Sequence, residues 1–316
     1  MNTLSTELER YLSVRRSLGY ALASQAPVLR KFVAFAENEG ADYVTTDLFL
    51  RWRAVCRSAN NDTWSGRFGA VRIFAQWMQG INPRHEIPPR GLIPRRASRP
   101  RPFIYTDEQV RAIVGAAAQL PSAYGLRGLT WSTLFGLIAV TGLRISEAVG
   151  IDNEDVALEH GVLTIKRGKN GKSRIVVIAD CTAARLGAYQ VERDRLIGRQ
   201  PVPFFLTESG SRPSRRAAEY HFARLSQTIG LRSPRTDHRH GRGPRIHDLR
   251  HTFAVRTIIN WYRRGLDADR EMYKLTAYLG HDKPADTYWY IEAVPELLAL
   301  AAERATQSID KKGGVR

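Results

Sequence analysis

Apolar residues recur at helical spacing through the first 80 residues of the chain. One stripe begins at Leu4 and ends at Gly19, and a second covers 28–36 and ends near Gly40. Two further helices are predicted from residues suited to N-caps, Thr45-Thr46-Asp47 and Asn61-Asp62-Thr63, each followed by an apolar stripe. The sequence therefore predicts a module of four helices with little β-structure.

A proline-rich segment follows at 81–103. Its prolines exclude regular structure, and they are Pro83, Pro88, Pro89, Pro94, Pro100 and Pro102. Six arginines are interleaved with them. The segment is predicted to be a basic linker, which either lies along a phosphate backbone or is a plain solvated hinge.

The pattern changes after residue 104. Thr106 with Gln109 three positions on is typical of a capping box, and 130–140 is an apolar stretch that predicts a buried helix. Two short β-patterns at 162–166 and 174–178 flank a Gly- and Lys-rich turn, which predicts a β-hairpin.

The rest of the chain is predicted to be mostly helical. Residues 180–230 suit helices broken by prolines, 232–243 suit a loop, and 295–305 suit a short amphipathic helix. The predicted fold class is mainly α with a small β-sheet. We expect a helical domain at 1–98, a linker at 81–103 and an α+β domain at 104–316.

Charge narrows the class of partner. The formal net charge of the 316 residues is +17, which favours a polyanion, with nucleic acid first and an anionic membrane second. The membrane interpretation is weak, because apolar runs such as 134–140 fall far short of the roughly 20 residues of a spanning helix. The N-terminus shows no secretion signal.

Cysteine and glycine patterns exclude several site types. Cys56 and Cys181 are too few for a disulfide framework or a zinc site, so free thiols in a cytoplasmic protein are expected. Gly171-Lys172-Ser173 is not a phosphate-binding loop, because Lys166 stands where the first glycine belongs. His238-Arg239-His240 is a poor metal site, because arginines surround it and no carboxylate accompanies it.

Candidate chemistry gathers between Arg245 and Tyr290. His247 and Arg250 stand three positions apart and share one face of a helix. Leu279-Gly280-His281 follows, and Tyr290 comes nine positions after that histidine. Arginine pairs with phosphate in a bidentate manner, and a phenol beside it suggests a nucleophile that attacks phosphorus. Each element alone would ordinarily be structural, so the prediction depends on the set.

The whole set resembles the tyrosine recombinase (phage integrase) family. The resemblance covers about residues 104–300, and it rests on three segments in the family's order: Thr141-Gly142-Leu143-Arg144-Ile145-Ser146-Glu147, His247-Asp248-Leu249-Arg250-His251-Thr252-Phe253, and Leu279-Gly280-His281 with Tyr290. The helical module at 1–98 is similar to that family's core DNA-binding domain.

The resemblance implies a reaction and its residues. Tyr290 attacks a phosphodiester of double-stranded DNA and forms a 3′-phosphotyrosine with a free 5′-hydroxyl. Arg144 and Arg250 hold the non-bridging oxygens, and His247 accepts the phenol proton. Independently of the resemblance, Glu147 lies three positions from Arg144 and can orient its guanidinium, although that pair alone would be an ordinary helix salt bridge.

The remaining roles are also implied by the resemblance. His281 donates a hydrogen bond to the phosphate, and Lys169 protonates the leaving oxygen, with Lys172 as the alternative. Neither a metal nor another cofactor is needed, because the covalent link retains the bond energy. A homotetramer on two DNA sites is expected, acting in integration, excision or transposition of a mobile element.

Two other functions remain open. A DNA-binding regulator could use the same basic fold without strand exchange, although the complete set of residues argues against it. A type IB topoisomerase is a closer alternative, because its nicking chemistry is nearly identical.

Overall fold

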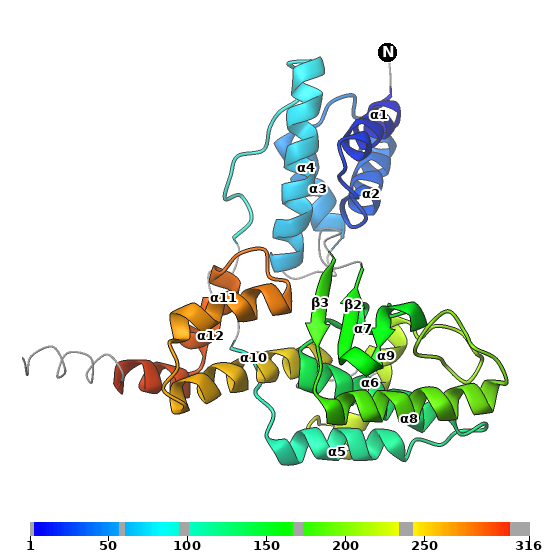
Figure 1. The fold of residues 1–316 in the computed structure, drawn as a ribbon. Coiled ribbons are helices and arrows are strands. Elements are labelled where there is room, and N and C mark those ends of the chain that lie inside the picture. The colour runs from blue at the N-terminus through cyan, green and yellow to red at the C-terminus, as the bar shows by residue number, and fades with distance from the viewer. Residues whose placement is uncertain (1–2, 57–60, 95–100, 167–172, 234–242, 304–316) are drawn as a thin grey trace, which may run out of the picture. The chain divides into compact units, whose positions relative to one another are not determined.

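The chain folds into two compact units, Met1–Pro100 and Arg101–Arg316. The structure, a computed structural model, describes residues 3–56, 61–94, 101–166, 173–233 and 243–303. Helices dominate both units (Figure 1), which confirms the predicted fold class.

The first unit is built from α1 (Leu4–Ser17), α2 (Gln25–Asn38), α3 (Thr46–Val55) and α4 (Asn61–Ile81). Thr45 caps α3, as predicted, because its side chain accepts a hydrogen bond from the Leu48 amide. Edge-to-face aromatic contacts join the helices, because Trp52 on α3 meets Phe32 on α2 and Phe49 on α3 meets Trp64 on α4. The prediction of a four-helix module is confirmed for the part of this unit that the structure describes.

The first part of the predicted linker, at 82–94, packs against the first unit. His85 and Ile93 are buried in the first unit, and His85 Nδ1 accepts a hydrogen bond from the Val44 amide at 3.0 Å. The Glu86 amide in turn donates to the Val44 carbonyl. Prolines exclude helix and sheet here, but the segment at 82–94 still packs onto its own unit through side-chain and backbone contacts.

The second unit is organised around α6 (Leu126–Thr141), which contacts α5 (Asp107–Ala118), α7 (Ile145–Ala148), α8 (Asp180–Ile197) and α10 (Ile246–Arg263). Most of α6 is buried, as its apolar sequence predicted. A Cβ atom at Gly128 would collide with the Ala118 carbonyl, so this glycine lets α5 lie close to α6. The predicted capping box of Thr106 and Gln109 begins α5.

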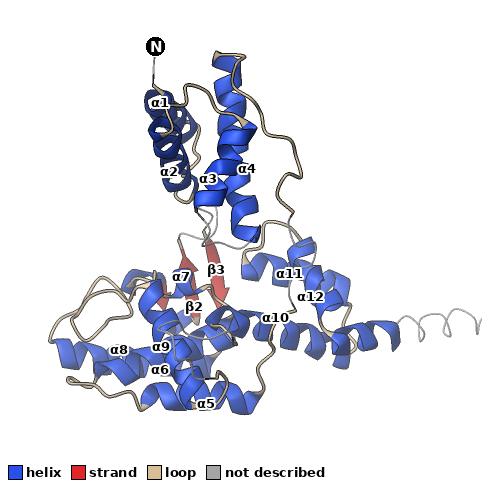
Figure 2. Cartoon of the chain, turned by 180° about the vertical axis from the view of Figure 1, so that it is seen from behind, coloured by secondary structure: helices blue, strands red, loops and turns tan. Residues whose placement is uncertain are grey.

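A small antiparallel sheet accompanies these helices (Figure 2). It consists of β1 (Val156–Ala157), β2 (Val162–Ile165) and β3 (Arg174–Val177), with Leu163 opposite Val176. The hairpin of β2 and β3 was predicted, and β1 adds a third, very short strand. Single 3₁₀ turns flank β1 at Asn153–Asp155 and Leu158–His160.

The remaining helices of the second unit are α9 (Arg215–Thr228), α11 (Ala268–Leu279) and α12 (Ala285–Ala293). Both α11 and α12 contact α10 and each other. Residues 295–303 are helical as well, and Leu297 is fully buried in the apolar cluster of this group. The terminal helix is therefore anchored in its own unit by at least one side chain.

Among the residues that the structure describes, none of the helices combines the length and apolar character that crossing a bilayer requires. Both cysteines, Cys56 and Cys181, are free thiols, as predicted.

Candidate active site

Gly142 ends α6 in a left-handed backbone conformation and leads into the first segment of the site. Gly142 has a φ of 64°, and a Cβ atom there would come within 2.6 Å of the Phe253 ring. Only glycine suits both the backbone and the space. The turn then delivers Arg144 as the N-cap residue of α7.

Glu147 binds two arginines at once. One guanidinium belongs to Arg144, whose Nη1 donates to Glu147 Oε1 at 2.7 Å. The other belongs to Arg174 on β3, whose Nη1 and Nη2 donate to the two carboxylate oxygens at 2.9 and 2.8 Å. The predicted orienting role of Glu147 is thus supported by direct contact, and the hairpin strand is tied to the Arg144 turn.

These arginines set the protonation state of Glu147. Burial acts to raise its pKa, but hydrogen bonds from Arg174 and from the Arg144 backbone, together with the Arg174 charge, outweigh it and lower the pKa to about 2. Because the folded pKa lies below the unfolded value of about 4.3, the stabilisation is present above that value and is lost as the pH falls toward 2.

Substitution Glu147→Gln should remove this acid-sensitive contribution. It should lower the melting temperature at pH 7 by on the order of 5–10 °C, because about 3 kcal/mol of charge stabilisation is lost. The difference between variant and wild type should shrink between pH 4 and pH 2. Thermal melts over this range measure it, with Glu159→Gln, at an exposed carboxylate outside the site, as a control that should melt like wild type. A Glu147→Gln chain that melts at the wild-type temperature at pH 7 would contradict the assignment.

Arg250 is the most buried arginine of the site. It is only 1% exposed, and its Nη1 and Nη2 donate to the carbonyls of Gly142 at 2.8 Å and Leu279 at 2.7 Å. These carbonyls end α6 and α11, where helix dipoles place partial negative charge. Burial and the Arg144 charge lower the pKa of Arg250 to about 10, which still leaves it charged at pH 7.

Arg144 reaches the same helix end. Its Nη2 donates to the Gly280 carbonyl at 2.8 Å, and its Nη1 lies 3.4 Å from the Leu279 carbonyl. Two guanidinium groups thus meet at one turn, and the hydrogen bonds to protein use only part of their five N–H donors each. Such a pair suits a phosphate with two non-bridging oxygens.

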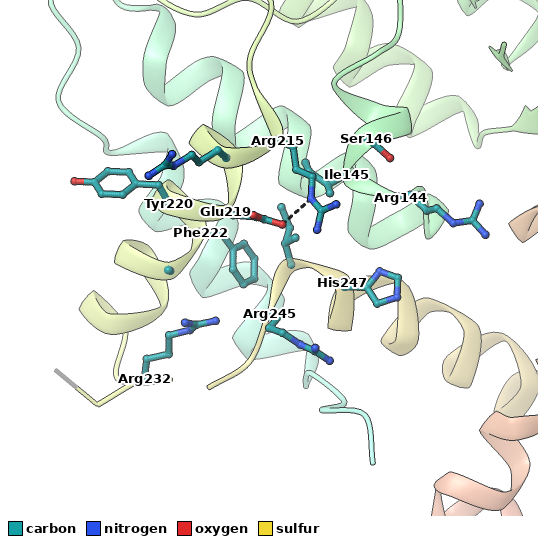
Figure 3. A pocket seen from close by; sticks show the side chains of 13 residues that line it. Arg144, Ile145, Ser146, Arg215, Glu219, Tyr220, Phe222, Arg232, Arg245 and His247 are labelled. Carbon is teal, nitrogen blue, oxygen red and sulfur yellow. Dashed lines mark hydrogen bonds and ion pairs between the residues drawn. The ribbon is translucent and has the colours of Figure 1, made fainter. Parts of the chain in front are cut away.

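His247 and Arg144 also line a basic cavity of about 920 Å³ (Figure 3). Further arginines come from α9, from the segment after it and from the start of α10: Arg215, Arg216, Arg232 and Arg245. Glu219 is the carboxylate of this lining, and it pairs with Arg215 at 2.8 Å. Partial burial and the Arg250 charge lower the pKa of His247, so its imidazole is neutral at pH 7.

The predicted nucleophile lies on α12. Tyr290 is 1% exposed, and its hydroxyl is 2.9 Å from Nδ1 of His251 on α10. Tyr288 points elsewhere, because its hydroxyl donates to Asp269 at 3.0 Å on α11. A helical segment places positions two apart on different faces. His281 stacks near the Tyr290 ring, with centroids 6.5 Å apart, and its Nδ1 is 2.8 Å from the Thr287 hydroxyl.

Five of the six predicted site residues therefore come from three neighbouring parts of the second unit: the α6–α7 turn, α10, and the segment from the end of α11 to α12. Lys169 and its alternative Lys172 lie outside the described residues, as do His238 and His240.

Arg174 was not among the predicted site residues. Alternation along β3 offers a signal for it, because Val176 and Ile178 are buried on the same face of the strand. An arginine on a buried face requires a partner, which is Glu147 here. Its Nε also donates to the Tyr278 carbonyl at 2.8 Å, so it holds the end of α11.

Comparison with known proteins identifies the family of the chain. A family model described as "Phage integrase family" matches residues 104–296. The putative integrase/recombinase y4rB of Sinorhizobium fredii is 38% identical over 309 residues, which cover 96% of this chain and 97% of that protein. The tyrosine recombinase XerD of Caulobacter vibrioides is 28% identical over 265 residues, with 81% and 79% covered.

Solved structures share the fold. The Tn1549 transposon integrase in complex with transposon right end DNA superposes with a TM-score of 0.66 at 15% identity, covering 95% of this chain and 99% of that one. The XerH recombinase bound to palindromic difH substrate gives 0.64 at 20% identity, with 94% and 84% covered.

The chain belongs to the phage integrase family of tyrosine recombinases, enzymes that cleave and rejoin DNA. The function that this membership supports is site-specific recombination.

Proposed function

We propose that this chain recombines double-stranded DNA at specific sites, with Tyr290 as the nucleophile, in the integration, excision or transposition of a mobile element. The observation that carries the proposal is the meeting of Arg144 and Arg250 at the Leu279 carbonyl. Both guanidinium groups donate to this carbonyl, and each keeps further N–H donors with which the pair can bind a single phosphate.

The chemistry then follows from charge. Attack on phosphorus adds negative charge to the non-bridging oxygens, and two fixed guanidinium groups stabilise that charge without rearranging. Glu147 keeps Arg144 in place, and the helix ends hold Arg250. His281, neighbouring the Tyr290 ring, donates a further hydrogen bond to the phosphate.

The basic cavity supports duplex DNA as the substrate. Its arginines lie next to Arg144 and His247, so a DNA backbone that enters the site passes over them. We assign residues 104–316 to the catalytic domain and residues 1–98 to a helical domain that binds the core of the DNA site. The solved λ integrase tetramer is bound to a Holliday junction, and we propose a homotetramer on two sites here as well.

A plasmid assay tests this function. DNA that flanks the chain's own gene supplies candidate sites, which a footprint with the purified protein narrows to a core. A plasmid with two such cores should yield recombined circles. Relaxed plasmid without recombined circles would instead indicate a topoisomerase, and binding without cleavage would indicate a regulator.

The leaving 5′-oxygen needs a proton, which we assign to Lys169. Lys169→Ala should lower the cleavage rate by roughly 10²–10⁴, because a positioned acid is lost. A substrate with a 5′-bridging phosphorothioate has a leaving group that needs no acid, so it should restore the rate of Lys169→Ala in a single-turnover cleavage assay.

Lys172→Ala is the matched control for this experiment. Any defect that it shows should persist with the phosphorothioate substrate. Rescue of Lys172→Ala without rescue of Lys169→Ala would move the acid to Lys172.

A further inference from the structure

The hydroxyl of Tyr290 has a defined imidazole partner. His251 Nδ1 lies 2.9 Å from it, and both side chains are buried. His251 follows Arg250 directly on α10, whereas Tyr290 lies on α12, so the contact joins two elements of the site. A hydrogen bond of this length is short enough for proton transfer between the two atoms.

The other side of the His251 ring faces a carboxylate. Asp248 Oδ1 is 4.0 Å from His251 Nε2, too far for a hydrogen bond but close enough for the carboxylate to attract the imidazole once the ring is protonated. Asp248 is held by the start of α10, because its carboxylate accepts the Arg245 amide at 2.7 Å and Arg245 Nη2 at 3.2 Å. The imidazole of His251 therefore lies between the phenol of Tyr290 and the carboxylate of Asp248.

This order has a chemical meaning. For Nδ1 to accept the phenol proton, a neutral His251 must carry its hydrogen on Nε2, the atom that faces Asp248. The Asp248 charge favours that tautomer, and it stabilises the imidazolium that forms after transfer. A nucleophile, a base and a group that orients the base are the parts of an activated hydroxyl.

His247 was the proton acceptor expected from the sequence. Its ring lies edge-on to His251, with centroids 4.6 Å apart, and it lines the basic cavity beside Arg144. Its exposure toward the cavity suits contact with the DNA phosphate, while His251 lies behind it against the nucleophile.

We propose that His251 is a catalytic residue that takes the proton of Tyr290 during cleavage and returns it during rejoining, with Asp248 as its positioning residue. The proposal rests on the assignment of Tyr290 as nucleophile. In cleavage the Tyr290 oxygen forms a bond to phosphorus, the phenol proton moves to His251 Nδ1, and the bond from phosphorus to the 5′-oxygen breaks while the acid assigned above, Lys169, protonates that oxygen. In rejoining a 5′-hydroxyl attacks phosphorus and gives its proton to the now neutral Lys169, the tyrosine oxygen leaves, and His251 gives the phenol proton back to it.

The size of the effect follows from the phenol's acidity. An unperturbed tyrosine has a pKa of about 10, so little phenolate exists at pH 7, and a positioned base contributes roughly 10²–10⁴ in rate. The titratable groups that face His251 are His247 and Asp248 from α10 and Tyr290 from α12, and Arg245 is the fixed charge on Asp248.

The decisive variant is His251→Asn. The Asn side-chain oxygen can stand where Nδ1 stood and still accept the Tyr290 hydrogen bond, but it cannot take a proton. The 316-residue wild type, His251→Asn, His251→Ala and His247→Asn are compared in single turnovers on a nicked duplex that traps the covalent adduct. Thermal melts and DNA binding show which variants fold.

We expect His251→Asn to fold, to bind DNA like wild type and to form adduct about 100-fold more slowly or worse. Its rate should keep rising with pH to pH 9, because hydroxide must then remove the phenol proton, whereas the wild-type rate should level off. Added imidazole should partly restore His251→Ala. His247→Asn should keep the wild-type shape of the pH profile.

Three results would overturn the inference. A His251→Asn rate within about threefold of wild type means that the contact only positions the phenol. A faster rate means that His251 holds Tyr290 in a resting position. If His247→Asn shows the altered pH profile and His251→Asn keeps the wild-type shape, the base is His247. Absence of adduct with wild-type protein on footprinted DNA would instead reject the proposed function itself.

Discussion

A Tyr290→Phe chain should bind its DNA site as tightly as wild type and form no covalent protein–DNA adduct. The substitution removes one oxygen from a buried ring, so the apolar packing of α12 is kept and the lost hydrogen bond to His251 costs about 1 kcal/mol of stability. No adduct can form without an oxygen placed for in-line attack on phosphorus. Denaturing gels of the protein with an end-labelled nicked duplex measure the adduct.

Tyr288→Phe is the matched control on the same helix. The Tyr288 hydroxyl donates to Asp269 rather than into the site, so this variant should form adduct at close to the wild-type rate. An adduct with Tyr290→Phe and none with Tyr288→Phe would move the nucleophile by two residues.

The second large effect is the salt dependence of DNA binding. A chain with a net charge of +17 that contacts six to ten phosphates should lose roughly 10³–10⁵ in affinity between about 50 and about 200 mM salt, because bound cations are released from the DNA. Titrations at several salt concentrations give the slope of log affinity against log salt. A flat line would contradict binding through the phosphate backbone.

Single substitutions locate this charge. Arg216→Ala removes an exposed arginine of the basic cavity and should reduce the slope by about 1. Arg111→Ala removes an exposed arginine of α5 that pairs with Glu108 and lies outside the cavity, so its slope should match wild type.

The helices with strong apolar stripes could be predicted from the sequence, because the helical spacing of their apolar residues indicates which face is buried. The capped starts at Thr45 and Thr106 and the buried helix α6 are examples. The strand β1 could not, since two residues carry no periodicity and pair only because β2 offers an edge. The packing of 82–94 depends on His85 reaching Val44, a contact between positions far apart in the sequence.

The candidate site shows the same division. Arg144, His247, Arg250, His281 and Tyr290 could be named in advance because their order and spacing resemble a family. Their partners could be found only from the structure: Arg174 meets Glu147 only when β3 lies beside α7, and His251 meets Tyr290 only when α12 packs on α10. Lys169 lies outside the described residues, so its role stays a prediction.

One backbone atom, the Leu279 carbonyl, accepts from both Arg250 and Arg144. The same turn continues through Gly280 to His281, whose ring contacts Thr287 one helical turn before Tyr290. A displacement of this carbonyl therefore changes the hydrogen bonds of both guanidinium groups and the support of α12 together. By thermodynamic reciprocity, a phosphate that fixes the two guanidinium groups must favour one arrangement of the nucleophile's helix to the same extent that this arrangement favours phosphate. The affinity for phosphate and the position of Tyr290 then depend on the same conformational equilibrium. Amide hydrogen exchange at the end of α11, measured with and without DNA, would follow that equilibrium.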